Sequence, residues 1–249
     1  MPSLSVVIVA QDESRTIARV LQAIKELAAE ILLLDSGSTD GTPQMATENG
    51  ARVVHQDWLG YAAQKNFAID MAVSDWILSL DADEIVSPEL ANEIATLLKS
   101  PDLESHDGYR IPRVLYIGDT PVRHGGFYPD AQLRLFKRGK GRFNDRLVHE
   151  AIRVQGAVGM LKHDLLHYAY ADVNGFSAAM EKYAQLSAEE YKKSGKAGWK
   201  GHPLNEMMHP SWTFFYRYVI RAGFLDGKLG WRLNSIYSDY VRNKIRYSR

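Results

Sequence analysis

The sequence predicts an α/β fold in which helices flank a mostly parallel sheet. The chain begins with an apolar run, Leu4–Ala10, that is typical of a strand buried on both faces. Over roughly the first hundred residues, short apolar runs alternate with stretches of helical periodicity, which is the pattern of βαβ units. Three of these runs end in acidic or polar residues, and parallel sheets bind ligands at the carboxyl ends of their strands. These observations place a candidate site along one edge of the sheet.

A helix and a second strand follow the opening strand. Ser14 is placed to cap this helix. Its apolar residues recur at helical spacing: Ile17, Val20, Leu21, Ile24 and Leu27. The second strand, 31–34, ends at Asp35. The stretch 35–42 is dense in turn formers, and Pro43 suits the first turn of the next helix.

The pattern then repeats. Residues 53–54 indicate a short third strand, and residues 61–71 indicate a helix. The apolar run 76–80 predicts a fourth strand, which ends at Asp81-Ala82-Asp83-Glu84. A further helix opens at Ser87-Pro88-Glu89.

The middle of the chain is less regular. Strands are expected at 108–114, 132–137 and 163–170, with a loop at 118–129 and a helix at 176–193.

The C-terminal segment is basic and aromatic. From Ser211 to Arg249 the net charge is +6, which leaves −6 on the rest of the chain. Arg217 and Arg221 fall on one face of an amphipathic helix. The opposite face carries Trp212, Phe215, Tyr216, Val219 and Gly223.

Composition excludes several classes of function. The 249 residues include no cysteine, which excludes disulfides, thiolate zinc sites and cysteine nucleophiles. An acidic body without a recognised motif argues against nucleic-acid binding. The N-terminus lacks the pattern of a signal peptide, and no apolar stretch reaches the ~20 residues that cross a bilayer. A cytoplasmic protein is expected.

Asp81 and Asp83 are the first candidates for chemistry. Two carboxylates at the mouth of a crevice repel each other unless a cation neutralises them. Mg²⁺ or Mn²⁺ bridging to a diphosphate meets that need and stabilises a departing nucleoside diphosphate. The alternative is an acidic cluster that caps the helix after Ser87. Asp35 also has two possible roles. Its carboxylate can bind a base or ribose, or it can belong to a turn that caps the next helix.

Four blocks in order resemble the family 2 glycosyltransferases, which have the GT-A fold. They are Gln11-Asp12-Glu13, Leu34–Thr42, Gln64–Ala68 and Leu80–Glu84. The resemblance covers roughly residues 4 to 100. It implies inverting, metal-dependent transfer from a nucleotide sugar, often a UDP-sugar.

The resemblance also implies roles for single residues. Asp35 contacts the uridine, and Gln11, Asp12 and Glu13 lie beside the nucleotide. Lys65 approaches the nucleotide as a basic residue. Asp81 reaches the ribose or the metal, and Asp83 binds the metal. Asp12 departs from the family, which usually has Asn there.

An inverting transfer needs a carboxylate that deprotonates the acceptor hydroxyl. By resemblance this base is Glu150, in Val148-His149-Glu150, with Asp145 and Asp130 as rivals. The alternative is that Glu150 is a surface acid at a strand end. Three further side chains are candidate contacts: Arg134 and Arg138 for phosphate or acceptor, and His167 for metal or acceptor. An edge strand with solvated basic residues also explains the arginines.

Residues 128–136, 148–150 and 223–230 resemble the lipopolysaccharide-core β-1,4-glucosyltransferase branch. This implies UDP-glucose as donor and a lipid-linked inner-core saccharide as acceptor, at the inner face of the cytoplasmic membrane. The predicted domains are a GT-A domain at 1–175, with a nucleotide-sugar half (1–100) and an acceptor half (101–175), and a helical extension at 176–249. The segment 211–249 is expected on the membrane surface; alternatively, its first helix packs against the body.

Other functions remain open. A transferase of the same fold can act on a polyprenyl phosphate or a protein. A nucleotidyltransferase is disfavoured because Val9–Glu13 lacks the glycines of a phosphate loop. A non-catalytic module that binds nucleotide sugars or lipid surfaces is the alternative of another class.

Overall fold

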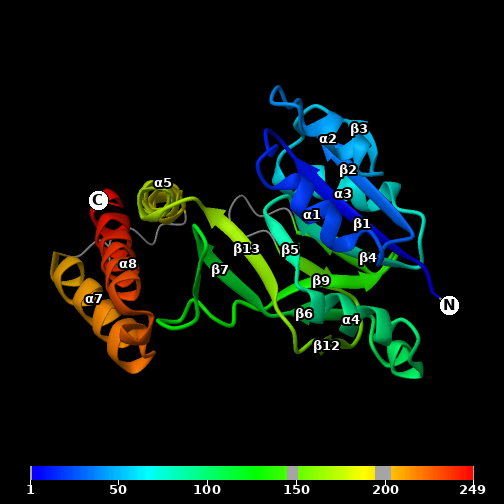
Figure 1. The fold of residues 1–249 in the computed structure, drawn as a ribbon. Helices are drawn as coiled ribbons and strands as arrows, with labels where there is room; N and C mark the ends of the chain where they lie inside the picture. Colours follow the sequence, from blue (N-terminus) through cyan, green and yellow to red (C-terminus); the bar gives the residue numbers. More distant parts are fainter. Residues whose placement is uncertain (1, 145–150, 194–202, 249) are drawn as a thin grey trace. The chain divides into compact units, whose positions relative to one another are not determined.

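The computed structural model describes residues 2–144, 151–193 and 203–248 (Figure 1). The chain folds as two compact units. The first holds Met1–Arg113 and Asp130–His167, and the second holds Val114–Pro129 and Tyr168–Arg249. The domain boundary expected after residue 175 stays a prediction. The second unit takes in residues 114–129 of the expected acceptor half.

The first unit is built on a seven-stranded sheet in the order β12-β6-β9-β4-β1-β2-β3 (Figure 1). The strands are β1 Leu4–Ala10, β2 Glu30–Asp35, β3 Arg52–His55, β4 Trp76–Asp81, β6 Gly108–Ile111, β9 Gln132–Lys137 and β12 Val158–Met160. Strands β1 to β4 run parallel, whereas β9 is antiparallel to both neighbours. The predicted α/β class with a mostly parallel sheet is confirmed.

The order of the strands creates a switch point. The chain runs outward from β1 to β2 and β3 and then returns to β4 on the other side of β1. Ile8 of β1 therefore lies between Leu33 of β2 and Leu80 of β4. Ligands of open α/β sheets bind at such a point, beyond the carboxyl ends of the strands.

Four helices accompany these strands: α1 Ile17–Ile24, α2 Thr42–Glu48, α3 Tyr61–Met71 and α4 Pro88–Leu97. Four residues of the apolar face expected on α1 are buried, whereas Leu27 lies beyond the end of the helix and is half-buried. The cap expected at Ser14 is wrong: Thr16 precedes the helix without a side-chain cap, and the Ser14 N–H donates to Asp40. Ser87 does cap α4, because its Oγ accepts a hydrogen bond from the Leu90 N–H at 3.1 Å.

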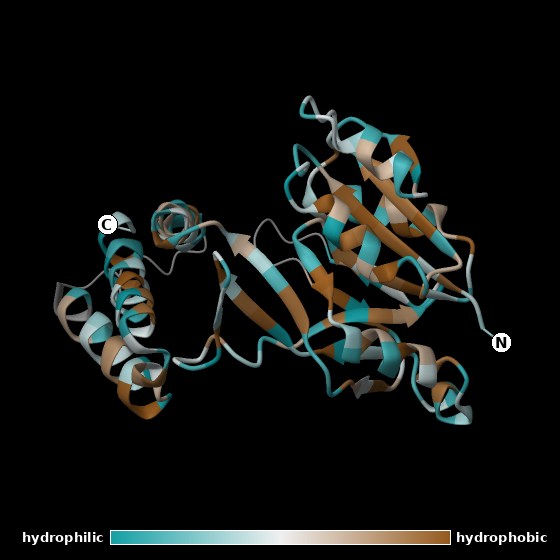
Figure 2. Cartoon of the chain, in the orientation of Figure 1, coloured by the Kyte–Doolittle hydropathy of each residue, from teal (hydrophilic) through white to brown (hydrophobic). Residues whose placement is uncertain are grey.

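The core fixes α3 against the sheet. Ala68 and Ile69 of α3 are buried against Val7, Leu32 and Ile77 of the central strands. Apolar residues accordingly dominate those strands in Figure 2. This packing fixes the position of Lys65, one helical turn before Ile69.

Shorter strands complete the first unit. β5 (Glu84–Val86) pairs antiparallel with β13 (Leu165–Tyr170) through residues 165–167, and β10 (Gly141–Phe143) pairs with β11 (Ile152–Val154). The single strand expected at 108–114 is wrong. Pro112 lacks an N–H for a ladder, and it separates β6 from β7 (Arg113–Ile117).

The second unit is mainly helical. Its elements after β7 are β8 Thr120–Val122, α5 Val173–Lys193, α7 Pro203–Phe215, η2 Tyr216–Ile220, η3 Gly223–Asp226 and α8 Gly227–Tyr247. The carboxylate of Glu181 on α5 accepts hydrogen bonds from Asn243 (2.8 Å) and Tyr247 (2.6 Å) of α8. Within the described ranges, none of the helices is long and apolar enough to cross a membrane.

Candidate active site

Asp12 begins the site at the end of β1. Its backbone is in the left-handed region, with φ 56°, which Asp and Asn tolerate better than bulkier residues. The Asp12 N–H donates to Ser38 Oγ at 2.9 Å, and Asp12 Oδ1 accepts from the Thr39 N–H at 2.7 Å. Since Asn adopts the same conformation, the departure at position 12 is compatible with this turn.

Asp35 is fixed within its own turn. The side chain is buried, and Oδ2 accepts hydrogen bonds from the N–H groups of Gly37 (3.0 Å) and Ser38 (3.1 Å). Beneath it, the buried Gln64 donates to Ser36 Oγ at 3.0 Å. Hydrogen bonds therefore fix the position of the Asp35 carboxylate. Its contact with a nucleoside stays a prediction.

Asp81 is held by two cations. Its Oδ1 lies 2.6 Å from Lys65 Nζ, and its Oδ2 lies 2.5 Å from an Nη atom of Arg134. Burial raises the pKa of the Asp81 carboxyl, but the charges of Arg134 and Lys65 outweigh burial and hold that pKa well below its usual range. Two side chains of the protein thus neutralise Asp81, whereas the sequence had suggested a metal ion for that purpose.

Glu84 anchors this cluster from inside. The fully buried side chain accepts hydrogen bonds from Arg134 (2.6 Å) and Arg113 (2.8 Å). Its other oxygen accepts from the Asp81 N–H at 3.1 Å. The guanidinium of Arg113 also binds Asp130, which was a rival for the base. Glu84 follows the Asp-x-Asp pair directly, but nothing local in the sequence signals its burial.

We expect Arg134→Met to destabilise the fold by about 3–5 kcal/mol, because it removes a cation from the buried Glu84 and from Asp81. The Arg134 side chain is only 7% exposed, so water cannot replace it. Urea unfolding measures this loss. The matched control is Arg138→Met, directly after the end of β9. Because the Arg138 side chain is exposed, this substitution should change stability by less than about 0.5 kcal/mol. Equal effects of the two substitutions would contradict the anchoring role.

The charge of Asp81 predicts a pH dependence. Since its pKa is lower in the folded than in the unfolded chain, the ionised carboxylate stabilises the fold above the ordinary carboxyl pKa of about 4. This stabilisation is lost as pH falls below that value. Unfolding free energies of wild type and Asp81→Asn should therefore differ at neutral pH and converge in acid. A difference that stays constant with pH would contradict this account.

Asp83 and His167 face each other beside this cluster. The antiparallel register of β5 and β13 sets His167 opposite Glu84, one residue after Asp83. His167 Nε2 consequently lies 3.3 Å from Asp83 Oδ2, with both side chains partly exposed. Burial, followed by the charge of Asp83, raises the pKa of the Glu13 carboxyl. The residues that follow β1 and β4 are therefore close enough for their charges to interact. Gln11, at the end of β1, is exposed.

The donor atoms fit a divalent cation that arrives with a diphosphate. Among the described residues no group of three or more potential protein ligands is found. Asp83 and His167 offer one carboxylate oxygen and one imidazole nitrogen, and such cations often use few protein ligands together with substrate phosphates. Both Asp81 oxygens already contact cations, so Asp81 is the less available of the two aspartates.

The expected base, Glu150, and its rival Asp145 lie outside the described residues. The residues on either side of 145–150 are paired: Asn144 N–H donates to the Ala151 carbonyl at 3.2 Å. Asn66 of α3 holds this hairpin through two hydrogen bonds with the backbone of Phe143. Lys65 Nζ lies 5.1 Å from the centre of the Phe143 ring. Phe143, just before this segment, therefore lies beside Lys65, which pairs with Asp81.

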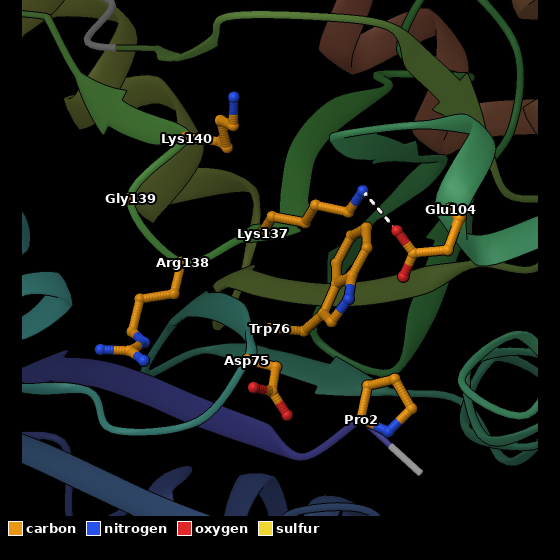
Figure 3. A pocket seen from close by; sticks show the side chains of 8 residues that line it. All are labelled: Pro2, Asp75, Trp76, Glu104, Lys137, Arg138, Gly139 and Lys140. Carbon is orange, nitrogen blue, oxygen red and sulfur yellow. Dashed lines mark hydrogen bonds and ion pairs between the residues drawn. The ribbon is translucent and has the colours of Figure 1, made fainter.

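Arg138 lies elsewhere. It lines a basic groove of about 760 Å³ at the amino end of β4, which Figure 3 shows from close by. Trp76 and Lys137 share this groove, and Lys137 pairs there with Glu104 at 3.2 Å. Because β9 is antiparallel to β4, the end of β9 lies at the amino end of β4, where Lys137 pairs with Trp76. Arg138 follows there, about 13 Å along the extended chain from Arg134. Only Arg134 joins the carboxylate cluster.

Several known proteins are similar to this chain in sequence. Residues 5–166 match the family model described as glycosyl transferase family 2. An uncharacterized glycosyltransferase of Rickettsia felis is 30% identical over 237 residues, which cover 91% of this chain and 82% of the relative. The lipopolysaccharide core biosynthesis glycosyltransferase LpsC of Rhizobium meliloti is 34% identical over 205 residues, which cover 78% and 73% of the two chains.

A solved structure resembles the whole fold. The mannosyltransferase PcManGT of Pyrobaculum calidifontis, in complex with GDP-Man and Mn²⁺, has a TM-score of 0.59 at 15% sequence identity. The likeness covers 98% of this chain and 86% of that one. At this identity it bears on the fold alone.

Proposed function

The chain belongs to glycosyl transferase family 2, and we propose that it is an inverting hexosyltransferase. It transfers a hexose from a nucleotide sugar to a saccharide hydroxyl, with inversion at the anomeric carbon. The predicted family and its GT-A fold are confirmed by these matches. The proposed donor is UDP-glucose. The proposed acceptor is a lipid-linked saccharide of the lipopolysaccharide-core type, the pathway for which LpsC is named.

One observation carries the proposal. The Asp83–His167 pair lies next to the Asp81–Lys65 pair at the switch point between β1 and β4. Carboxylate, imidazole and ammonium groups together suit a diphosphate and its cation. The turns that hold Asp12 and Asp35 flank the same edge and are proposed to receive the nucleoside.

Asp83 and His167 are proposed to hold a divalent cation, Mn²⁺ or Mg²⁺, with Asp81 turned to the ribose or to the cation. When bound, such a cation neutralises the diphosphate and the charge that grows on the departing nucleoside diphosphate. Lys65 adds positive charge on the same side, and its position is set by the core packing of α3.

The proposed base is Glu150. The acceptor oxygen forms a bond to the anomeric carbon as the bond from that carbon to the diphosphate breaks, and the acceptor proton passes to the Glu150 carboxylate. What supports this assignment is the resemblance of Val148-His149-Glu150 to the acidic motif of the family, together with the contact of Phe143, earlier in the same stretch, with Lys65.

The test is release of the nucleoside diphosphate from a panel of UDP-glucose, UDP-galactose and GDP-mannose, with Mn²⁺, Mg²⁺ or EDTA. We expect release from UDP-glucose that EDTA abolishes and either metal restores. Release from GDP-mannose alone would replace the proposed donor. Release from none of the three, with a lipopolysaccharide-core acceptor present, would contradict the proposed function.

A further inference from the structure

The second unit exposes a continuous apolar stripe on α7 and η2. Its members follow at helical spacing: Met208, Trp212, Phe215, Tyr216 and Val219. Trp212 is 64% exposed and Met208 is 62% exposed. The stripe continues through η3 to α8, where Phe224, Leu225 and Trp231 are also exposed. In Figure 2, helix α7 carries brown bands among paler and teal ones.

The opposite face of the same helix packs inside the unit. Ser238 Oγ of α8 donates to the carbonyl of the buried Pro210 at 2.8 Å. The Arg217 guanidinium lies 4.3 Å from the Phe127 ring centre and 3.9 Å from that of Tyr237. Burial lowers the pKa of Arg217. Arg217 on the opposite face is therefore packed against aromatic rings, whereas the members of the apolar stripe stay exposed.

The stripe is bordered by positive charge. Arg221, Lys228 and Arg232 are exposed and form no ion pair within the described residues. The sequence from 207 to 238 contains one acidic residue, Asp226. Its side chain is only 10% exposed, and its Oδ1 lies 2.8 Å from His124 Nδ1.

A groove lies among these cations. It has a volume of about 420 Å³ and is lined by Tyr218, Gly227, Lys228, Trp231 and Arg232. Exposed aromatic rings next to Lys and Arg are typical of segments that lie in the headgroup region of a bilayer.

We propose that residues 207–232, here called the lipid-docking surface, bind the surface of an anionic phospholipid bilayer, with the apolar stripe among the headgroups and the three cations against their phosphates. The surface begins before the expected segment 211–249, at residue 207, and also ends earlier, at residue 232. The end of α8 packs instead, since Ile245 is buried and Tyr247 donates to Glu181. The inference rests on the proposed function in one respect: it gives a lipid-linked acceptor a place to meet the enzyme.

Charge favours lipid over a second copy of this chain. A two-fold contact through the same surface sets two positively charged surfaces against each other. No exposed acidic residue between 207 and 238 offsets that repulsion, because Asp226 is already bound to His124. Anionic headgroups instead complement Arg221, Lys228 and Arg232.

The test is flotation of the full chain with vesicles of phosphatidylcholine, with or without phosphatidylglycerol. We expect binding on the order of 100-fold weaker without the anionic lipid, as three surface cations require. Lys228→Glu with Arg232→Glu, and separately Trp212→Ser with Leu225→Ser, should each weaken binding at least about tenfold. All four side chains are exposed, so the fold should persist, and thermal melting checks this.

Matched pairs on the first unit are the controls. Arg138→Glu with Lys140→Glu, and Trp58→Ser with Leu59→Ser, change side chains that are also exposed and should leave flotation unchanged. Loss of flotation in the controls, or no loss in the test variants, would overturn the proposal. So would a wild-type dimer that Trp212→Ser with Leu225→Ser dissociates, in a chain that does not float.

Release of UDP from UDP-glucose, measured without vesicles on the same preparations, separates the two proposals. A chain that floats but releases no nucleoside diphosphate overturns the proposed function and leaves the lipid-docking surface standing. A chain that releases it but does not float overturns only the lipid-docking surface.

Discussion

Asp83→Asn is expected to lower metal-dependent release of UDP from UDP-glucose by about 1000-fold, which corresponds to about 4 kcal/mol of transition-state stabilisation. Asn preserves the shape of the side chain but removes the charge that a divalent cation requires. Asp83 is the more available aspartate of the pair, because Asp81 is already bound by Lys65 and Arg134. Steady-state rates across a range of Mn²⁺ concentrations measure the effect.

Two comparisons make this result specific. Asp102→Asn changes an exposed carboxylate in η1 (Pro101–Ser105), outside the proposed site, and should leave the rate unchanged. Asp83→Asn should also melt at a temperature near that of wild type, since the ion-pair partner of Asp83 among the described residues is a partly exposed histidine. A variant that keeps the full metal-dependent rate would contradict the assignment of Asp83.

Glu150→Gln is expected to reduce transfer to a saccharide acceptor by about 100- to 10,000-fold, the range that general-base catalysis contributes. Binding of UDP-glucose should persist, because the proposed donor contacts lie on Asp12, Asp35 and Asp83. Product formation by chromatography and donor affinity by calorimetry give the two readouts.

Asp145→Asn is the matched control, because it removes a carboxylate from the same segment. If Asp145→Asn abolishes transfer and Glu150→Gln does not, the two roles are exchanged. A Glu150→Gln enzyme with full transfer activity would contradict the assignment of the base.

The sheet and its site edge were predictable because their signals are local. The apolar runs of β1, β2 and β4 and the periodicity of α1 lie within single segments. Parallel strands then bring their carboxyl ends together without any further information. That rule alone predicted the proximity of Glu13 to Asp81 and Asp83, whose charges add to burial in raising the pKa of the Glu13 carboxyl.

The buried ion pairs were not predictable, because their partners are far apart in sequence. Glu84 meets Arg113 and Arg134, which lie 29 and 50 positions later. No local pattern distinguishes an anchored glutamate from a surface one. The packing of Arg217 in η2 was not predictable for a related reason: periodicity gave the two faces of the segment, but the rings of Phe127 and Tyr237 come from distant parts of the chain.

The central claim is that the nucleotide sugar binds at the carboxyl edge of the sheet, and hydrogen exchange tests it most directly. Peptides that cover residues 35–42 and 79–86 should gain protection when UDP-glucose and Mn²⁺ are added, because a ligand there closes the backbone of both turns. The basic groove around Lys137 and Arg138 is the competing location for a phosphate. Protection confined to residues 137–140, with no change at 35–42 and 79–86, would contradict the account.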